Sequence, residues 1–145
     1  MRESLLVFVD GTICDTRQRH LLRGTPAFYS GSSIMGDVPT PGSLETITHL
    51  SGSYEIVYMA ARPAGAREAT ERWLSLFGFP PGPLYLADTL DERLAIAREL
   101  KSQRSFRAGI GDRWDDNELH LEIGCMSIIV KEHEPNWATV VRHLS

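Results

Sequence analysis

The sequence predicts an α/β protein built on a doubly wound parallel sheet. Five short apolar runs alternate with segments whose hydrophobic residues recur at helical spacing. Such alternation makes successive strands parallel, because each helix returns the chain to the same end of the sheet. The chain has 145 residues, of which 42% are hydrophobic and 23% are charged, so it can form one domain with a substantial core.

The predicted strands are apolar runs bounded by turn or helix signals. They span residues 5–9, 54–60, 84–87, 106–111 and 126–130. The first run passes directly into Asp10, Gly11 and Thr12, so its carboxyl end delivers a carboxylate into a tight turn. Ligands bind at the carboxyl ends of strands in open α/β sheets, which makes this turn the first candidate for a functional site.

Helix signals lie between these strands. Thr40 and Pro41 predict a capped helix that ends at Gly52, and Pro63 predicts the start of a helix that ends at Gly78. Three more helices are predicted near residues 89–103, 115–124 and 135–144. The segment from residue 15 to residue 39 has little hydrophobic periodicity, and an irregular segment of this length is usually functional.

Composition excludes some classes of protein. The formal net charge of −4 argues against a general nucleic-acid binder, although a local basic patch remains compatible with it. No apolar run reaches the length of a membrane span and the N-terminus has no signal-peptide core, so we expect a cytoplasmic protein without a membrane partner. Cys14 and Cys125 have neither metal-site nor disulfide spacing, which favours free thiols.

Residues 5–16 resemble motif I of the haloacid dehalogenase (HAD) superfamily, in which a hydrophobic strand ends in D-x-D-G-T and continues L-x-D-T. In that family the first Asp is the phosphorylated nucleophile, and the second is the general acid/base, whose backbone carbonyl also binds magnesium. Aligning Gly11 and Thr12 with the family's G-T puts Asp10 at the acid/base position and Phe8 at the nucleophile position. A second register makes Asp10 the nucleophile with Thr12 two residues on, as in P-type ATPases, but the continuation fits the first.

The ends of later segments resemble motifs II and III. The family's T-G-R-P appears here as Ala60-Ala61-Arg62-Pro63, so the phosphate-binding hydroxyl is absent while Arg62 remains. Arg62 could bind phosphate in a bidentate pair or simply pair with a helix acid. Arg93 stands near the place of the motif III lysine and keeps its charge but not its compact ammonium geometry; the alternative is an ordinary helix-surface role.

Residues 111–116 resemble motif IV, G-D-x-x-x-D, whose acids coordinate Mg²⁺ in the family. The resemblance implies a magnesium site made by Asp10, Asp112 and Asp116, with Asp115 facing away. Carboxylates at strand ends are suitable ligands for this ion. An acidic helix N-terminus is the alternative explanation for Asp115 and Asp116.

The segment of residues 14–39 corresponds to the flap of the superfamily and is too short for a large cap, so we expect an open pocket. It carries a basic cluster whose members are Arg17, Arg19, His20 and Arg23. This cluster is either an electrostatic rim for a phosphorylated ligand or a solvated helical turn. The segment resembles the phosphatase domain of polynucleotide kinase-phosphatases and related nucleotide phosphatases in the order of Cys14-Asp15-Thr16-Arg17, Arg19-His20, Phe28 and Asp37-Val38-Pro39.

The resemblance covers nearly the whole chain. It implies a HAD-like, Rossmannoid three-layer sandwich with a five-stranded, mostly parallel sheet, the first strand central and no large cap. Residues 1–145 would form a single domain. A small phosphorylated ligand or nucleotide is the implied partner, and a nucleic-acid end is the second option.

Two hypotheses about function remain open. In the first, the protein is catalytically degenerate because Phe8 removes both the nucleophile and a magnesium ligand. Its site then binds a phosphorylated ligand or a partner protein through Phe8, Gly11, Arg17 and Arg62. In the second, the protein is a magnesium-dependent phosphomonoesterase acting on nucleotides or polynucleotide ends.

The second hypothesis assigns catalysis to a small set of residues. Asp10 would act as the nucleophile or as a general base that activates water. Thr12 and Arg93 would complete the catalytic group.

Overall fold

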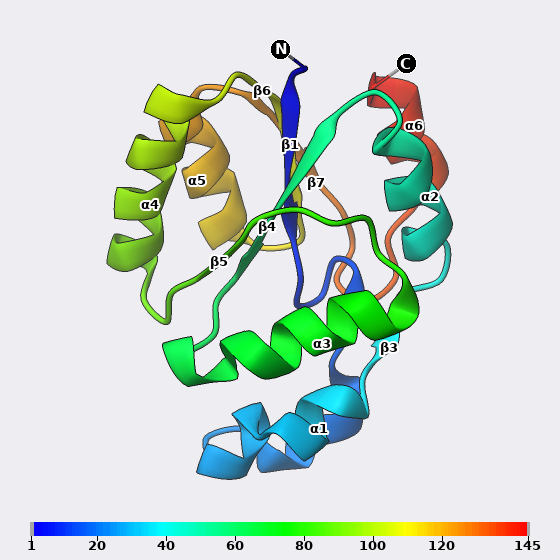
Figure 1. The fold of residues 1–145 in the computed structure, drawn as a ribbon, viewed down its shortest axis with the longest axis vertical. Coiled ribbons are helices and arrows are strands. Elements are labelled where there is room, and N and C mark those ends of the chain that lie inside the picture. The colour runs from blue at the N-terminus through cyan, green and yellow to red at the C-terminus, as the bar shows by residue number, and fades with distance from the viewer. Residues whose placement is uncertain (1, 145) are drawn as a thin grey trace.

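The computed structural model describes residues 2–144, which fold in three layers around a parallel sheet (Figure 1). Within these residues the sheet has five strands in the order β5-β4-β1-β6-β7, and every neighbouring pair is parallel. The strands are β1 (Ser4–Phe8), β4 (Glu55–Ala60), β5 (Leu84–Leu86), β6 (Phe106–Gly111) and β7 (Met126–Ile129). The predicted fold class is therefore confirmed, with the first strand at the centre.

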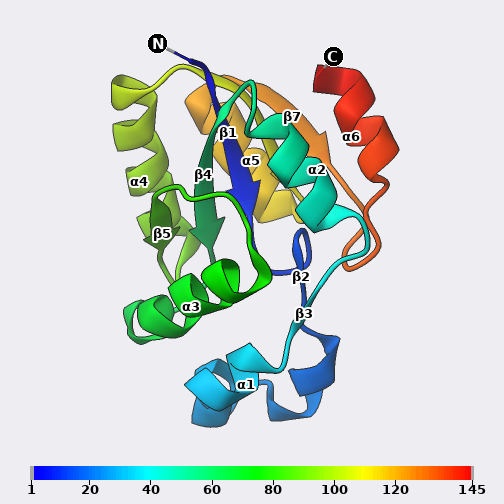
Figure 2. The same ribbon diagram turned by 45° about the vertical axis from the view of Figure 1, so that its right-hand side comes forward.

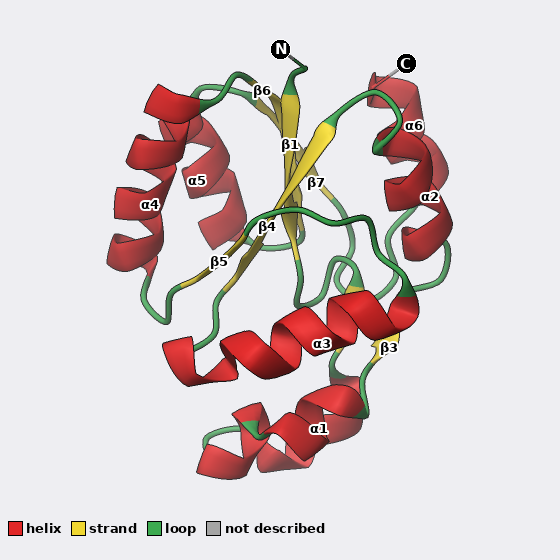
Figure 3. Ribbon diagram, viewed as in Figure 1, coloured by secondary structure: helices red, strands yellow, loops and turns green. Residues whose placement is uncertain are grey.

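Helices cover both faces of the sheet (Figure 3). One face is covered by α4 (Leu90–Gln103) and α5 (Trp114–Ile123). The other face is covered by α2 (Ser43–Leu50), the turn η3 (Ala64–Ala66), α3 (Arg67–Phe77) and α6 (Trp137–Leu144). Within residues 2–144, no helix combines the length and the apolar character needed to cross a membrane.

The central strand serves both halves of the core. Successive side chains of a strand point to opposite faces of its sheet. Leu5 and Val7 accordingly lie in the cluster with α2, α3 and α6, whereas Leu6 and Phe8 lie in the cluster with α4 and α5. Phe8 is therefore both the last residue of β1 and a member of the core.

The segment after β1 is more regular than its sequence indicates. It forms β2 (Cys14–Asp15), η1 (Arg17–Leu22), η2 (Pro26–Tyr29), α1 (Gly31–Met35) and β3 (Val38–Pro39). Strands β2 and β3 pair in antiparallel fashion, so the two ends of the segment of residues 16–37 lie next to each other. This segment forms a small helical flap beside α3 (Figure 2). The prediction of an irregular segment is wrong, since helices of four to six residues are too short to produce a hydrophobic period.

The predicted cap at Thr40 is also wrong. Helix α2 begins after Gly42, whose φ of 82° suits a residue without a side chain. The hydroxyl of Thr40 instead donates to the carbonyl oxygen of Thr12 at 2.7 Å. Thr40 thus ties the end of β3 to the turn after β1, which is part of the site.

Candidate functional site

A pocket of about 360 Å³ lies between the carboxyl ends of the strands and the flap. Its apolar lining consists of Phe8, Phe28, Tyr29, Met59, Ala60 and Ala61. Its charged lining consists of Asp10, Arg23, Arg113, Asp116 and Glu132. Residues from the turn after β1 and from the flap therefore meet at the end of the sheet where ligands bind in this class of fold.

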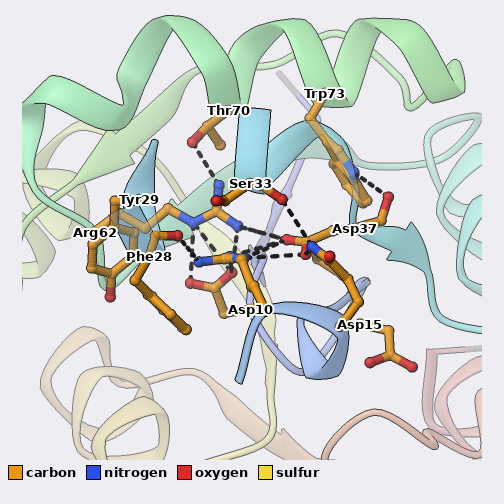
Figure 4. Close-up of polar contacts among 12 residues, drawn as sticks. Asp10, Asp15, Phe28, Tyr29, Ser33, Asp37, Arg62, Thr70 and Trp73 are labelled. Carbon is orange, nitrogen blue, oxygen red and sulfur yellow. Dashed lines mark hydrogen bonds and ion pairs between the residues drawn. The ribbon is translucent and has the colours of Figure 1, made fainter. Parts of the chain in front are cut away.

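Asp10 is bound by Arg62 (Figure 4). Strand β4, which Arg62 follows, lies next to β1, and this brings the two side chains together. Nε of Arg62 donates to Oδ2 of Asp10 at 3.1 Å and Nη2 to Oδ1 at 2.5 Å, while Nη1 donates to Thr70 Oγ1 at 2.7 Å. Arg62 is 1% exposed, so its guanidinium group is not open to solvent. Its carboxylate partner is Asp10 and not an acid of a helix.

A second buried ion pair joins Arg19 to Asp37. Nε of Arg19 donates to both carboxylate oxygens of Asp37, at 3.1 and 3.0 Å, and Nη1 donates to the carbonyl oxygen of Phe28 at 2.7 Å. The guanidinium carbon lies 4.3 Å from the centre of the Phe28 ring, which adds a cation–π contact. Nη2 of Arg19 is 3.6 Å from Oδ1 of Asp10 and connects the two pairs.

Asp10, Arg19, Asp37 and Arg62 thus form a buried quartet with two positive and two negative charges. The thiol of Cys14 lies beside it and donates to Oδ2 of Asp37 at 3.2 Å. Burial and the two neighbouring carboxylates raise the pKa of Cys14 well above its ordinary value. A protonated thiol is no nucleophile, which agrees with a structural role for Cys14.

The quartet fixes the protonation of Asp10. Burial alone would raise the pKa of its carboxyl group, but Arg62 and Arg19 outweigh burial and hold the pKa below its ordinary value. Asp10 is therefore an ionised carboxylate whose two oxygens are both engaged. Such a group is a poor general acid at neutral pH and a weak base and nucleophile.

Gly11, Thr12 and Asp112 are packed closely behind the turn. Thr12 donates to Oδ1 of Asp112 at 2.9 Å, and Gly11 has a φ of 79° with no room for a Cβ beside the Asp112 carboxylate. Burial, followed by repulsion from Asp116, raises the pKa of Asp112 to about 7. Within residues 2–144, Oδ2 of Asp112 is buried without a hydrogen-bond partner.

Asp116 has a helix-capping role. Its Oδ2 accepts the backbone N–H groups of Asp112 and Arg113 at 2.9 and 3.1 Å, at the start of α5. Burial raises the pKa of Asp116 to about 6, although these hydrogen bonds act in the opposite direction. These contacts are those of an acidic residue at a helix N-terminus, which is the alternative to a magnesium ligand that the sequence leaves open for Asp116.

Arg93 and Arg17 are engaged elsewhere. Arg93 donates to the carbonyl oxygens of Ala87 and Asp88 at 3.0 and 3.1 Å, and to Oδ2 of Asp115 at 3.3 Å. Arg17 is exposed and pairs with Asp15 at 2.6 Å, outside the lining of the pocket. Of the four residues in the predicted basic cluster, Arg23 lines the pocket, whereas Arg19 is buried in the quartet.

The residues present do not fit the magnesium site that the resemblance implies. The side chain of Asp10 is committed to arginines, which leaves only its backbone carbonyl, Phe8 supplies no side-chain donor, and Asp116 caps a helix. Across the described part of the chain, no group of three or more His, Cys, Asp or Glu residues is arranged to hold a metal ion. The unpaired oxygen of Asp112 is one suitable donor, but magnesium binding in proteins usually needs more than one carboxylate or bound phosphate oxygens.

Comparison with known proteins gives matches among solved structures. No family model and no curated protein matches the sequence. A chain of the Pnkp1/Rnl/Hen1 RNA repair complex matches with a TM-score of 0.69 and 19% identity over 91% of this chain. A haloacid dehalogenase-like hydrolase from Streptococcus pneumoniae matches with a TM-score of 0.67 and 13% identity, covering 98% of this chain and 90% of that one. The chain has the HAD fold.

A further HAD family enzyme, from Bacteroides thetaiotaomicron, matches with a TM-score of 0.59 and 11% identity over 97% of this chain and 99% of that one. That enzyme is a mutant in complex with magnesium and inorganic phosphate. The present chain spans less than half of the RNA repair chains, 43% and 47% of their lengths. It therefore shares one HAD-fold unit with larger proteins as well as with small ones.

Phe8, at the position that the resemblance assigns to the nucleophile, is supported by apolar packing. It is 4% exposed and lies in one cluster with Met59 and Leu119. Its ring centre is 5.6 Å from that of His120, and burial lowers the pKa of His120 to about 4, so the imidazole is neutral. The surroundings thus suit a hydrophobic side chain rather than a carboxylate.

Sequence reasoning missed several residues of the site. Asp37, Thr70 and Glu132 are separated from Asp10 by long stretches of chain, and nothing in their local sequence marks them as its neighbours. Asp37 and Thr70 complete the hydrogen bonding of the two buried arginines, and Glu132 lines the pocket. These residues could be identified as part of the site only if it were known that the flap, β4 and α3 are in contact.

We expect Arg62→Met to lower the free energy of unfolding by about 2–4 kcal/mol, because it leaves the partly buried carboxylate of Asp10 without its main partner. Arg98→Met is the matched control, since Arg98 forms an exposed pair with Glu122 at 2.6 Å and should cost about 0–1 kcal/mol. Urea unfolding followed by circular dichroism measures both. Equal losses would contradict the structural weight given to Arg62.

Asp112→Asn should change stability in a pH-dependent way. The pKa of Asp112 is about 7 in the folded protein and 3.8 without structure, so between these values the folded state binds more protons and its stability falls as pH rises. Asn stays neutral. The variant should therefore become more stable than the natural protein from about pH 4 to about pH 7, by on the order of 2–4 kcal/mol. A pH-independent difference would contradict the raised pKa.

Proposed function

We propose that this HAD-fold chain is catalytically degenerate and that its pocket binds a small phosphorylated ligand, for which a nucleotide is the best fit. The clamp of Arg62 on both oxygens of Asp10 is the observation that carries the proposal. This clamp engages Asp10, the acid that is needed for catalysis in either alignment of motif I. Phe8 removes the other acid of the motif, so neither position offers a free carboxylate for phosphoryl transfer.

The pocket itself supports a ligand with an aromatic part. Phe28 and Tyr29, which are half-buried, line it with aromatic surface against which a planar base can pack. The volume of about 360 Å³ lies within the range of small-molecule sites. An apolar floor favours a base over a metal-bound phosphate.

The rim supports a phosphate. Arg23 and Arg113 are exposed and line the pocket, and neither forms an ion pair with a carboxylate anywhere in residues 2–144. The charge of Asp10 is offset by Arg62 and Arg19, so the negative potential of the floor is reduced. The RNA repair complex that contains one structural neighbour agrees with a nucleotide or a polynucleotide end as the ligand.

Isothermal titration calorimetry with AMP tests this proposal. We expect AMP to bind without added metal and adenosine to bind roughly tenfold more weakly, because it lacks a charged partner for the arginines. Arg113→Gln should reduce the affinity for AMP to a similar degree, whereas Arg98→Gln, far from the pocket lining, should not. No heat of binding with AMP would overturn the proposal.

Phosphate release from AMP in the presence of Mg²⁺ provides the second test. The natural protein should release no more phosphate than Asp10→Asn does. Release that Asp10→Asn abolishes would overturn degeneracy and would establish a phosphomonoesterase that uses Asp10 as nucleophile or base.

Phe8→Asp should create magnesium binding by adding a carboxylate to the pocket floor. The variant should also lose about 3 kcal/mol of stability or more, because it replaces a core ring with an acid. Millimolar Mg²⁺ should then raise the melting temperature of Phe8→Asp but not that of the neutral Phe8→Asn control, since a ligand stabilises the state that binds it. Equal responses of the two variants would contradict the first register of motif I.

A further inference from the structure

We propose that the site accepts two consecutive nucleotides, with the second base stacked on Trp114 and the linking phosphate beside Arg113. This inference rests on the proposed function and extends it to the ligand's length. Its basis is a second pocket, of about 600 Å³, that adjoins the first. Arg113 and Glu132 line both pockets, so the two pockets are neighbours on one surface.

Trp114 is the aromatic side chain of the second pocket. Its side chain is 82% exposed, whereas Trp73 and Trp137, the other two tryptophans of the sequence, are 0% and 6% exposed. An indole exposed to this degree is available as a stacking surface. Its neighbour in the sequence, Arg113, lies in the lining of both pockets.

This arrangement is complementary to a dinucleotide. Phe28 in the first pocket and Trp114 in the second are aromatic surfaces, and the cationic side chain of Arg113 lines both pockets. A ligand that uses all three features carries two planar groups joined by an anion. Stacking tolerates any base, so the ligand's length rather than its sequence should determine affinity.

The acids of the same surface limit the ligand to this length. Glu132 is exposed beside Arg113, Asp112 lines the second pocket, and the formal net charge of the chain is −4. Additional phosphates would meet no further basic surface in either pocket lining. We therefore expect affinity to rise from one nucleotide to two and to change little beyond two.

Calorimetry with AMP, a 5′-phosphorylated adenosine dinucleotide and the corresponding tetranucleotide tests the inference. The dinucleotide should bind about tenfold more tightly than AMP, in keeping with one additional stacked base. It should also quench tryptophan fluorescence, which reports on Trp114 because the other two indoles are buried. The tetranucleotide should bind within about twofold of the dinucleotide.

Trp114→Ala should abolish the gain from AMP to dinucleotide and leave the affinity for AMP unchanged, and Trp114→Phe should keep most of the gain. Leu121→Ala is the matched control: Leu121 is 63% exposed on the same helix and lines neither pocket, so its removal should change nothing. If AMP binds but the dinucleotide gains nothing, or if the gain persists in Trp114→Ala, the inference fails and the proposed function stands. If neither ligand binds, both fail.

Discussion

The pairing of Arg62 with Asp10 and of Arg19 with Asp37 is the interaction on which the rest of the site depends. Each charge is buried or partly buried, and a buried charge is tolerated only with a partner and satisfied hydrogen bonds. The four residues come from the turn after β1, from η1, from the segment before β3 and from the end of β4. Trp73 of α3 adds a bond from its indole N–H to the carbonyl oxygen of Asp37 at 3.0 Å. The flap is therefore attached through charges, hydrogen bonds and the buried side chain of Ile34, whereas Leu21, 87% exposed, contributes little.

The same pairing also bears on the chemistry that Asp10 can perform. A carboxylate that holds a guanidinium in place is ionised, engaged and unable to exchange protons near neutral pH. The replacement at Phe8 points in the same direction, because the surrounding cluster of Met59, Leu119 and the neutral His120 would disfavour an acid. Phe8 and Asp10 are thus each held in place by several neighbouring side chains. The catalytic degeneracy that we propose would therefore rest on the core and on the Asp10–Arg62 pair, and not on one isolated substitution.

The strands and the long helices could be predicted because burial on one or two faces leaves a period in the sequence. The small elements of the flap leave none, and Thr40 could be taken for a cap because its distant partner, Thr12, is invisible locally. The site shows the same division. Asp10, Gly11 and Phe8 could be placed at the end of the first strand from sequence alone. The burial of the arginines could not be predicted, because Arg17, Arg19 and Arg23 look alike in sequence. Contacts with Asp37 and Phe28 make Arg19 the buried one.

The residues of the site lie at two depths. Asp10, Asp112 and Phe8, which the resemblance to the family singles out, lie at the floor, where they are held by Arg62, by Thr12 and by the surrounding core. The side chains that can meet a ligand from solvent lie at the rim, where Arg23, Arg113 and Trp114 are exposed. Among the described residues, the ion pairs of the quartet include neither Arg23 nor Arg113, although Asp116 accepts the backbone N–H of Arg113. The function that we propose therefore assigns ligand selection to the shape, charge and stacking surfaces of the rim, and the loss of turnover to the floor.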